Sequence, residues 1–356
     1  GVISGSGTLT KTGSSTLTVT GNNTYEGATT VNAGTLLVST NNALGTVDAG
    51  TTVGANGTLT LAGVAYSTAE ALALSGTLGG TGTSSFAGVT TLGASSTITV
   101  ASGGALTMSE NITDGSDTYN ITKTGAGNLI LTDAVNSYDG TTTISAGTLT
   151  ISGAGTLDSG NYDANIINNA ALAYASSATQ SFDGVISGSG TLTKTGSSTL
   201  TLTGNNTFTG LLTVNAGTVS LTGSGQLVGA ISMGGSGTLT LSDDFTDGMS
   251  ISEIDAAGTI ALNATINMPA DLVNGQTIIW NTLNDNSANM TLLSAALTDN
   301  VLTDYAATDT GTSTTITANN KASTTIAASI GSTSNQAAGL VIANAAARSN
   351  TNVDAG

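Results

Sequence analysis

The sequence predicts an all-β protein with the architecture of a parallel β-helix, or solenoid. Three observations predict it: a set of side chains that suits a thin core, an internal repeat, and short alternating strands separated by glycines. Of the 356 residues, 3% are aromatic and 8% are charged, and the apolar residues are mostly Val, Ile, Leu and Ala. Small and β-branched side chains fill the narrow space between closely stacked sheets, whereas a compact globule needs larger ones.

Intrinsic disorder is the first alternative, because many Gly and Ser residues with few aromatics are typical of disordered chains. The chain nevertheless has a single Pro, few charges and a positive mean hydropathy of +0.21. Disordered chains usually carry more charge and fewer aliphatic side chains. The composition therefore favours a folded protein.

The internal repeat is visible by direct comparison of residues 1–38 with residues 184–221. These stretches are identical at 30 of 38 positions, and the eight differences fall at residues 19, 25, 26, 28, 29 and 36–38 of the first copy. A more diverged copy covers residues 119–151. Self-similarity of this kind is typical of repeat architectures, in which each unit stacks on its neighbours.

Within each copy the side chains alternate with a period of two, as in Thr16-Leu17-Thr18-Val19. This pattern predicts short strands with one buried face. Glycines separate the strands every six to eight residues, at Gly13, Gly21, Gly27 and Gly34. Because glycine tolerates tight corners, we expect coils of two or three strands, stacked about 4.8 Å apart.

We expect one β-helix over residues 1–290, with the looser stretches between the copies forming diverged coils. Residues 64–75 interrupt the pattern with Ala and Leu, and we expect a loop or a brief helix there. Residues 291–356 are rich in Ala, Thr and Asn. We interpret them as a C-terminal cap or linker region that is partly helical, with a helix over residues 335–348.

The composition excludes several classes of function. The net charge is −17, so phosphate backbones and anionic lipid headgroups would be repelled. The chain has no His and no Cys, which removes the usual base of a nucleophilic triad and the usual ligands of zinc. We therefore predict no catalytic, cofactor-binding or metal-binding residues, and no enzyme activity. No apolar run of about 18 residues is present, so we predict no membrane-spanning helix.

The run from Leu200 to Gly210 reads LTLTGNNTFTG and is followed by TVNAGTV over residues 213–219. It resembles the autotransporter-associated β-strand repeat, and residues 17–36 match that pattern equally well. Residues 129–149 match it with one insertion and with Asp133 in place of a corner glycine. In that family the repeat forms coils of a right-handed β-helix in large secreted passengers of Gram-negative bacteria, commonly adhesins or surface structural proteins. The resemblance also implies that residues 335–348 precede an outer-membrane barrel lying outside this chain.

Paired carboxylates are the signal for the polysaccharide-active enzymes that also use β-helices. Asp114 and Asp117 form one such group, and Asp243, Asp244 and Asp247 form another. Both groups fall in turns, where Asp commonly caps backbone groups, so we interpret them as structural. Glycine runs at residues 79–84 and 234–239 lack the Asp that a calcium-binding nonapeptide needs.

Three further sets of residues recur at fixed positions of the repeat. Lys11, Lys123 and Lys194 share one position, which we interpret as a strand-edge charge that discourages lateral pairing, with a charged row for a partner as the alternative. The pairs Asn22-Asn23 and Asn205-Asn206 are predicted to make turn hydrogen bonds or stacked Asn ladders. Tyr25, Tyr138 and Phe208 are predicted to pack beside a corner.

Three functions remain open on the sequence. The first is a non-catalytic secreted or cell-surface β-helix that acts as an adhesin, stalk or extracellular matrix component. Its predicted partners are a host or neighbouring cell surface, glycans or further copies of itself. The second is an extracellular filament whose subunits stack end to end through open strand edges. The third, a polysaccharide-active enzyme, is the least favoured.

Overall fold

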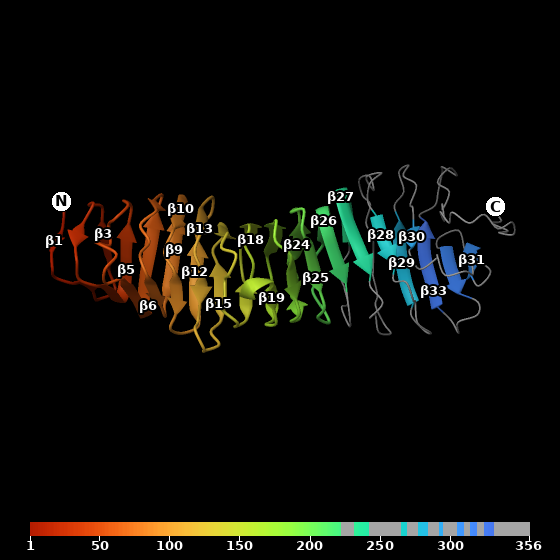
Figure 1. Ribbon diagram of the computed structural model, residues 1–356, viewed down its shortest axis with the longest axis horizontal. Coiled ribbons are helices and arrows are strands. Elements are labelled where there is room, and N and C mark those ends of the chain that lie inside the picture. The colour runs from red at the N-terminus through yellow and green to blue at the C-terminus, as the bar shows by residue number, and fades with distance from the viewer. Residues whose placement is uncertain are drawn as a thin grey trace. The chain divides into compact units, whose positions relative to one another are not determined.

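The computed structural model describes residues 1–221, 231–241, 265–268, 277–283, 292–294, 305–309, 314–318 and 324–330. The chain forms two compact units, Gly1–Thr191 and Leu192–Gly356. Within the described residues the secondary structure is almost entirely strand, with one short 3₁₀ helix at Asp158–Gly160. Figure 1 shows the strands of the first unit following one another in chain order from the red N-terminus.

The first unit is a parallel β-solenoid, as the sequence predicted, and most of its strands lie in three columns. In a column each strand pairs in parallel with the strand one coil earlier and the strand one coil later. Column A consists of β2 (Leu9–Lys11), the first parts of β5 (Thr29–Val38) and β6 (Thr51–Ala62), β8 (Leu72–Leu74), β11 (Thr90–Leu92) and β14 (Ile112–Thr113).

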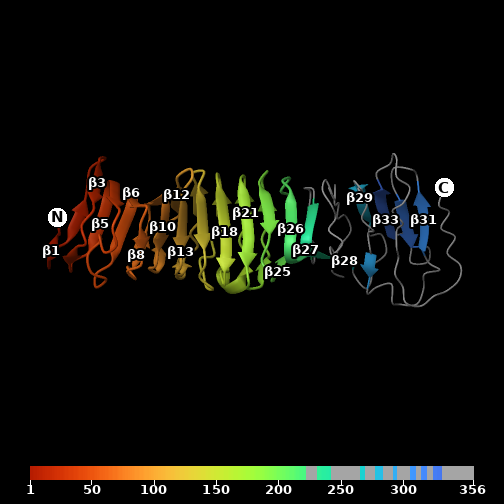
Figure 2. The ribbon, with the colours of Figure 1, turned by 90° about the horizontal axis from the view of Figure 1, so that it is seen from above.

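Column B begins with β3 (Thr16–Val19) and the second parts of β5 and β6. It continues through β9 (Thr77–Thr81), β12 (Ser96–Val100), β15 (Ile121–Thr124), β17 (Thr142–Ile144), β20 (Ile166–Asn168) and β23 (Ile186–Ser187). Column C consists of β7 (Ala65–Tyr66), β10 (Thr83–Phe86), β13 (Ala105–Met108), β16 (Asn128–Leu131), β18 (Thr148–Gly153) and β21 (Ala171–Ser176). Figure 2 shows the same strands from above.

Two short pairs complete the first unit. They are β1 (Ser4–Gly5) with β4 (Thr24–Tyr25), and β19 (Asn161–Tyr162) with β22 (Gln180–Phe182). The predicted loop or helix at residues 64–75 is wrong in part, since this stretch contributes β7 and β8, and only the residues between them form a loop. The alternation of side chains determines the strands there despite the Ala-rich composition, because Tyr66, Leu72 and Leu74 are all buried.

The second unit contains β24 (Thr191–Lys194), β25 (Thr199–Leu202), β26 (Leu212–Leu221) and β27 (Ile231–Leu241), all paired in parallel through β26. It continues with β28 (Thr265–Met268) and β30 (Leu292–Ser294), which also pair in parallel. A further sheet holds β29 (Thr277–Leu283), β31 (Tyr305–Asp309), β32 (Thr314–Ala318) and β33 (Thr324–Ile330), where β31–β32 and β32–β33 are antiparallel.

The predicted helix at residues 335–348 and the Asp243, Asp244 and Asp247 group lie outside the described residues. The predicted boundary near residue 290 stays a prediction. In the described part of the chain, no helix has the length and hydropathy needed to cross a membrane.

The core of the first unit is a stack of aliphatic residues that recur on successive coils. In column B, Leu36, Leu59, Leu78 and Ile98 are each fully buried and neighbour one another in register. Burying each such side chain stabilises the fold by about 1.5–3 kcal/mol. The thin core predicted from the small side chains is therefore observed.

Successive copies of the repeat enter the solenoid in different columns. The strand that carries Lys11 in the first copy lies in column A, whereas the equivalent strand with Lys123 in the second copy lies in column B. The next strand of each copy is shifted in the same way, since β3 lies in column B and β16 in column C. The same sequence motif thus presents its corners on different sides of the first unit.

Candidate functional site

The chemically distinctive groups of the repeat lie at its corners, and the lysines show this most clearly. Lys11 is 5% exposed, and Lys123 and Lys194 are fully buried. The interpretation of these lysines as strand-edge charges is therefore wrong. The alternative, a row of exposed charges for a partner, is wrong for the same reason. The cause is the period of two: in β24 the inward residues are Leu192 and Lys194, so the lysine occupies a core position.

Each ammonium group is held inside a corner by backbone carbonyl oxygens. The Nζ atom of Lys123 donates to the carbonyl oxygens of Thr124 and Gly125, both at 2.8 Å, and to that of Ala146 at 3.0 Å. Lys11 makes the same three bonds, to Thr12 and Gly13 at 2.7 Å and to Ala33 at 3.0 Å. Each lysine thus ties its own corner to the equivalent corner one coil later. We call this arrangement the lysine clamp.

The third copy repeats the clamp within the second unit. The Nζ atom of Lys194 donates to the carbonyl oxygen of Gly196 and, at 3.4 Å, to that of Ala216. Desolvation by burial lowers the pKa of Lys123 and of Lys194 to about 8. Because bonds to charged donors are stronger than neutral ones, the carbonyls offset part of the cost of burying the charge.

The lysine clamp leaves no room for a side chain at the facing corner. Gly34 has a φ of +70°, and a Cβ there would lie 2.3 Å from the carbonyl oxygen of Gly13 and 2.8 Å from Nζ of Lys11. Both the backbone conformation and the space therefore require glycine at this position. Gly13 also has a φ of +70°, but a Cβ there would contact nothing within 4 Å.

The recurrent asparagines bridge neighbouring coils. In the first copy, Oδ1 of Asn23 accepts from the amide of Ile3 at 2.8 Å, and its Nδ2 donates to the carbonyl of Ala43 at 2.7 Å. Asn136, at the same position of the second copy, donates to the carbonyl of Thr156 at 2.9 Å. The predicted turn hydrogen bonds are confirmed where Nδ2 of Asn136 donates to the carbonyl of Asp133 at 3.0 Å and Nδ2 of Asn206 donates to that of Gly204 at 2.7 Å. The bonds of Asn23 and Asn136 to neighbouring coils go to backbone groups, not to stacked amides.

The recurrent aromatic residues pack in the core, as predicted: Tyr25 and Tyr138 are 1% exposed and Phe208 is fully buried. The hydroxyl groups of the two tyrosines meet a threonine four residues later, with O–O distances of 2.5 Å for Tyr25–Thr29 and 2.8 Å for Tyr138–Thr142. Where the third copy has Phe208, the residue four positions on is Leu212, which is also buried. The polar group and its partner are thus present together or absent together, which agrees with the cost of an unpaired buried hydroxyl.

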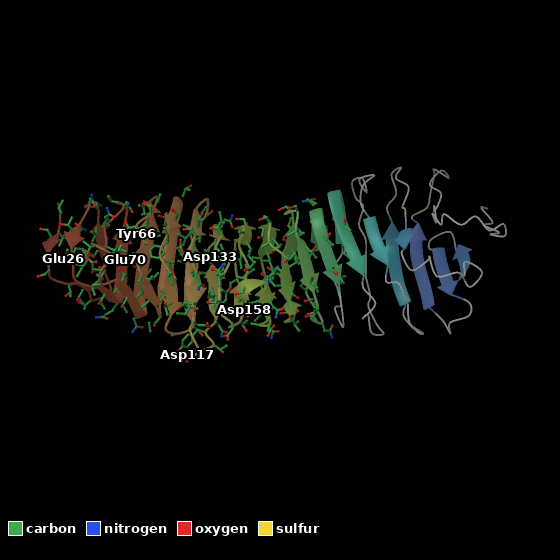
Figure 3. All side chains as sticks on the ribbon, in the orientation of Figure 1. Glu26, Tyr66, Glu70, Asp117, Asp133 and Asp158 are labelled. Carbon is green, nitrogen blue, oxygen red and sulfur yellow. The ribbon has the colours of Figure 1, made fainter. Side chains whose placement is uncertain are left out.

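The carboxylate pair Asp114 and Asp117, interpreted as structural from the sequence, lies at a turn. Oδ2 of Asp114 accepts from the amides of Tyr119 at 3.0 Å and Asp139 at 3.3 Å, so Asp114 caps backbone groups as expected. Burial is the main cause that raises the pKa of nearby Asp158, with Asp163, Asp139 and Asp114 adding to it. Asp117 and Asp158 are labelled in Figure 3. Among the described residues, no group of three acidic, His or Cys side chains is placed to hold a metal ion.

The glycine run at residues 79–84 is part of the sheet rather than a cation loop. Gly79 and Gly80 lie inside β9 and pair with Thr99 and Val100 of the next coil. A Cβ at Gly80 would lie 2.9 Å from Cβ of Leu106, which shows close packing between columns B and C. The second run lies within β27.

Comparisons with known proteins agree with this architecture. The passenger-associated-transport-repeat family matches residues 9–38, 121–151 and 192–221, and each match lies within one of the three copies found by self-comparison. The chain is 33% identical over 241 residues to the adhesin BmaC autotransporter of Brucella suis biovar 1 (strain 1330). That alignment covers 65% of this chain and 6% of the relative. No solved structure matches the chain. The chain thus carries three passenger-associated-transport-repeats and is similar over 65% of its length to part of an autotransporter adhesin.

Proposed function

We propose that this chain is a non-catalytic β-solenoid displayed on, or secreted from, a Gram-negative bacterium, where it acts as an adhesin, stalk or extracellular matrix component. The observation that carries the proposal is the 33% identity over 241 residues to an adhesin autotransporter. The buried polar groups of the corners support it, because their partners are structural. Lys11, Lys123 and Asn23 bond to backbone of their own or neighbouring coils, which leaves them unsuited to catalysis.

The outward face of column B is the surface that we propose for contact with a partner. Its outward residues neighbour one another in register from coil to coil and are threonines over seven coils: Thr16, Thr35, Thr58, Thr77, Thr97, Thr122 and Thr143. A regular row of hydroxyl groups without charge suits a neutral glycan or another polar surface. Extended faces of this kind bind through many weak contacts that act together.

The test is an adhesion assay with the purified chain on bacterial cells, host cells and immobilised neutral glycans. We expect saturable binding by the wild type. Replacing Thr58, Thr77 and Thr97 together by Arg places three large charges on the outward row of column B, and we expect it to abolish binding. The matched control replaces Thr52, Thr91 and Thr113, which lie outward in column A, by Arg. Absence of wild-type binding to cells, glycans and itself would contradict the adhesive role.

The non-catalytic part of the proposal has a separate test. A sugar-release screen over neutral and acidic polysaccharides is expected to show no turnover. Turnover that is lost when Asp243, Asp244 and Asp247 are replaced by Asn would overturn it. The end-to-end filament stays a prediction, which electron microscopy of the chain at high concentration would test.

A further inference from the structure

One carboxyl group is buried in the core of the first unit, away from any corner of the repeat copies. Glu70 is fully buried in the loop between β7 and β8. Its Oε1 accepts a hydrogen bond from the hydroxyl of Thr51 at 2.7 Å, whereas its Oε2 has no hydrogen-bond partner. Among the described residues, the only other buried side-chain polar atom without a hydrogen-bond partner is Oγ1 of Thr90. A buried acceptor without a partner is costly, and a buried charge is more so.

The two unpartnered groups lie on adjacent coils. Thr51 is the register neighbour of Leu72, and Leu72 is the register neighbour of Thr90 on the next coil. Glu70 precedes Leu72 by two residues and therefore enters the core on the coil between the two threonines. The coils are in contact here, since a Cβ at Gly88 would lie 1.8 Å from the carbonyl oxygen of Glu70.

The surroundings of Glu70 offer no compensating cation. The neighbouring strands β5, β6, β8, β10 and β11 contain no Lys, Arg, Asp or Glu. The titratable groups that face it are the hydroxyls of Tyr25 and Tyr66, whose pKa values burial raises and the Glu70 carboxylate raises further. Figure 3 labels Glu70 and Tyr66. Burial likewise raises the pKa of Glu70 above its ordinary value, although the Thr51 hydrogen bond lowers it.

We propose that Glu70 is a pH-sensitive latch, which keeps the coil of β7 and β8 closed while its carboxyl group is protonated and loosens that coil when the proton is lost. A proton on Oε2 removes the charge and converts an unpartnered acceptor into a donor. The buried hydroxyl of Thr90 on the next coil is also without a partner, so the two groups do not bond to each other in the structure. Deprotonation leaves a carboxylate with one hydrogen bond in a core without cations.

The direction of the pH effect follows from the raised pKa. The stability that Glu70 contributes is fully present below the ordinary glutamate pKa, and it is lost as the pH rises through the higher value of the folded protein. The loop at residues 67–71 is the element that would open first. Its bonds to the preceding coil run from Ser67 and Thr68 to Asn41 and Asn42, and from Thr51 to Glu70 and the carbonyl of Ala71.

Hydrogen–deuterium exchange of the whole chain between pH 4 and pH 8, corrected for the intrinsic rate, tests the latch. We expect the opening equilibrium of peptides from residues 64–75 to rise about tenfold for each pH unit across the interval between the ordinary and raised pKa values. We expect Glu70→Gln, which cannot ionise, to remove this dependence. Glu26→Gln, which changes an exposed carboxyl beside Tyr25, is the matched control and should behave like the wild type.

Parallel profiles for the wild type and Glu70→Gln would overturn the proposal, and so would an equal pH response in peptides from residues 121–131. If Glu70→Gln fails to fold, infrared spectroscopy of the wild type with ¹³C-labelled glutamate decides the matter. We expect the band of a protonated carboxyl group to persist above the ordinary glutamate pKa. Its disappearance at that pKa would contradict the latch.

Discussion

The ammonium group of Lys123 lies 3.0 Å from the carbonyl oxygen of Ala146, 23 residues later in the chain and one coil further along the solenoid. Together with its bonds to Thr124 and Gly125, this contact makes the lysine a link between two corners. The same link recurs at Lys11 and Lys194. A charged residue of the repeat thus contributes to the cohesion of successive coils.

Replacing Lys123 by Met is expected to destabilise the first unit by about 2 kcal/mol, because three partly buried carbonyl groups lose their donor while the apolar stem is kept. Guanidinium unfolding followed by circular dichroism measures the change. The control is Thr122→Val, an outward substitution on the same strand, which should change the stability by less than about 0.5 kcal/mol. Equal effects of the two substitutions would contradict the clamp.

Stability is also expected to depend on pH through the clamps. Burial lowers the pKa of Lys123 to about 8, below the value of an unfolded lysine, so the unfolded chain binds more protons than the folded chain between these values. The free energy of unfolding should therefore rise as the pH increases from about 8 towards 10. Unfolding titrations across this interval measure it, and the rise should be smaller in Lys123→Met. A flat or falling wild-type profile would show that the lysine pKa is not lowered.

Two corner glycines, Gly13 and Gly34, allow the cost of a positive φ to be measured separately from the cost of a steric clash. Gly13→Ala introduces only the unfavourable positive φ, and we expect a loss of about 1 kcal/mol. Gly34→Ala has the same φ and also brings a Cβ to 2.3 Å from the carbonyl oxygen of Gly13, so we expect a loss of about 3 kcal/mol or a failure to fold. Thermal unfolding of both variants measures the difference. Similar losses would mean that the two coils can move apart at this corner.

The pair Tyr25 and Thr29 is expected to be energetically coupled. Their hydroxyl oxygens are 2.5 Å apart in the core, so removing either one leaves the other with a partner missing. A double-mutant cycle with Tyr25→Phe and Thr29→Val should give a coupling of about 1 kcal/mol, measured by chemical unfolding. The double variant then resembles the third copy, where Phe208 precedes Leu212. Additive losses would contradict the coupling.

The solenoid could be predicted from the sequence because its signals are local. The alternation at residues 16–19 and the glycines at the corners each follow from strand and turn geometry. The aromatic position at Tyr25 could be predicted for the same reason. The column in which each strand lies could not be predicted, because nothing in the copies themselves indicates that the strand of Lys11 lies in column A and that of Lys123 in column B.

The buried charged residues were missed because charge alone was taken to indicate exposure. The alternation carried the correct signal in both cases. Lys194 is in phase with Leu192, and Glu70 is in phase with Leu72 and Leu74, all of which are buried. A charged side chain in the inward phase of a strand therefore predicts a buried, hydrogen-bonded group in this fold.

The stacking of coils in register is the central claim, and cross-linking tests it most directly because the chain has no cysteine of its own. Thr97 and Thr122 are register neighbours on adjacent coils, whereas Thr143 lies one coil further along the same outward row. With a short bifunctional thiol reagent, the Thr97→Cys, Thr122→Cys pair should cross-link rapidly within one chain, and the Thr97→Cys, Thr143→Cys pair should not. Equal rates for the two pairs, or a faster reaction of the second, would contradict the solenoid.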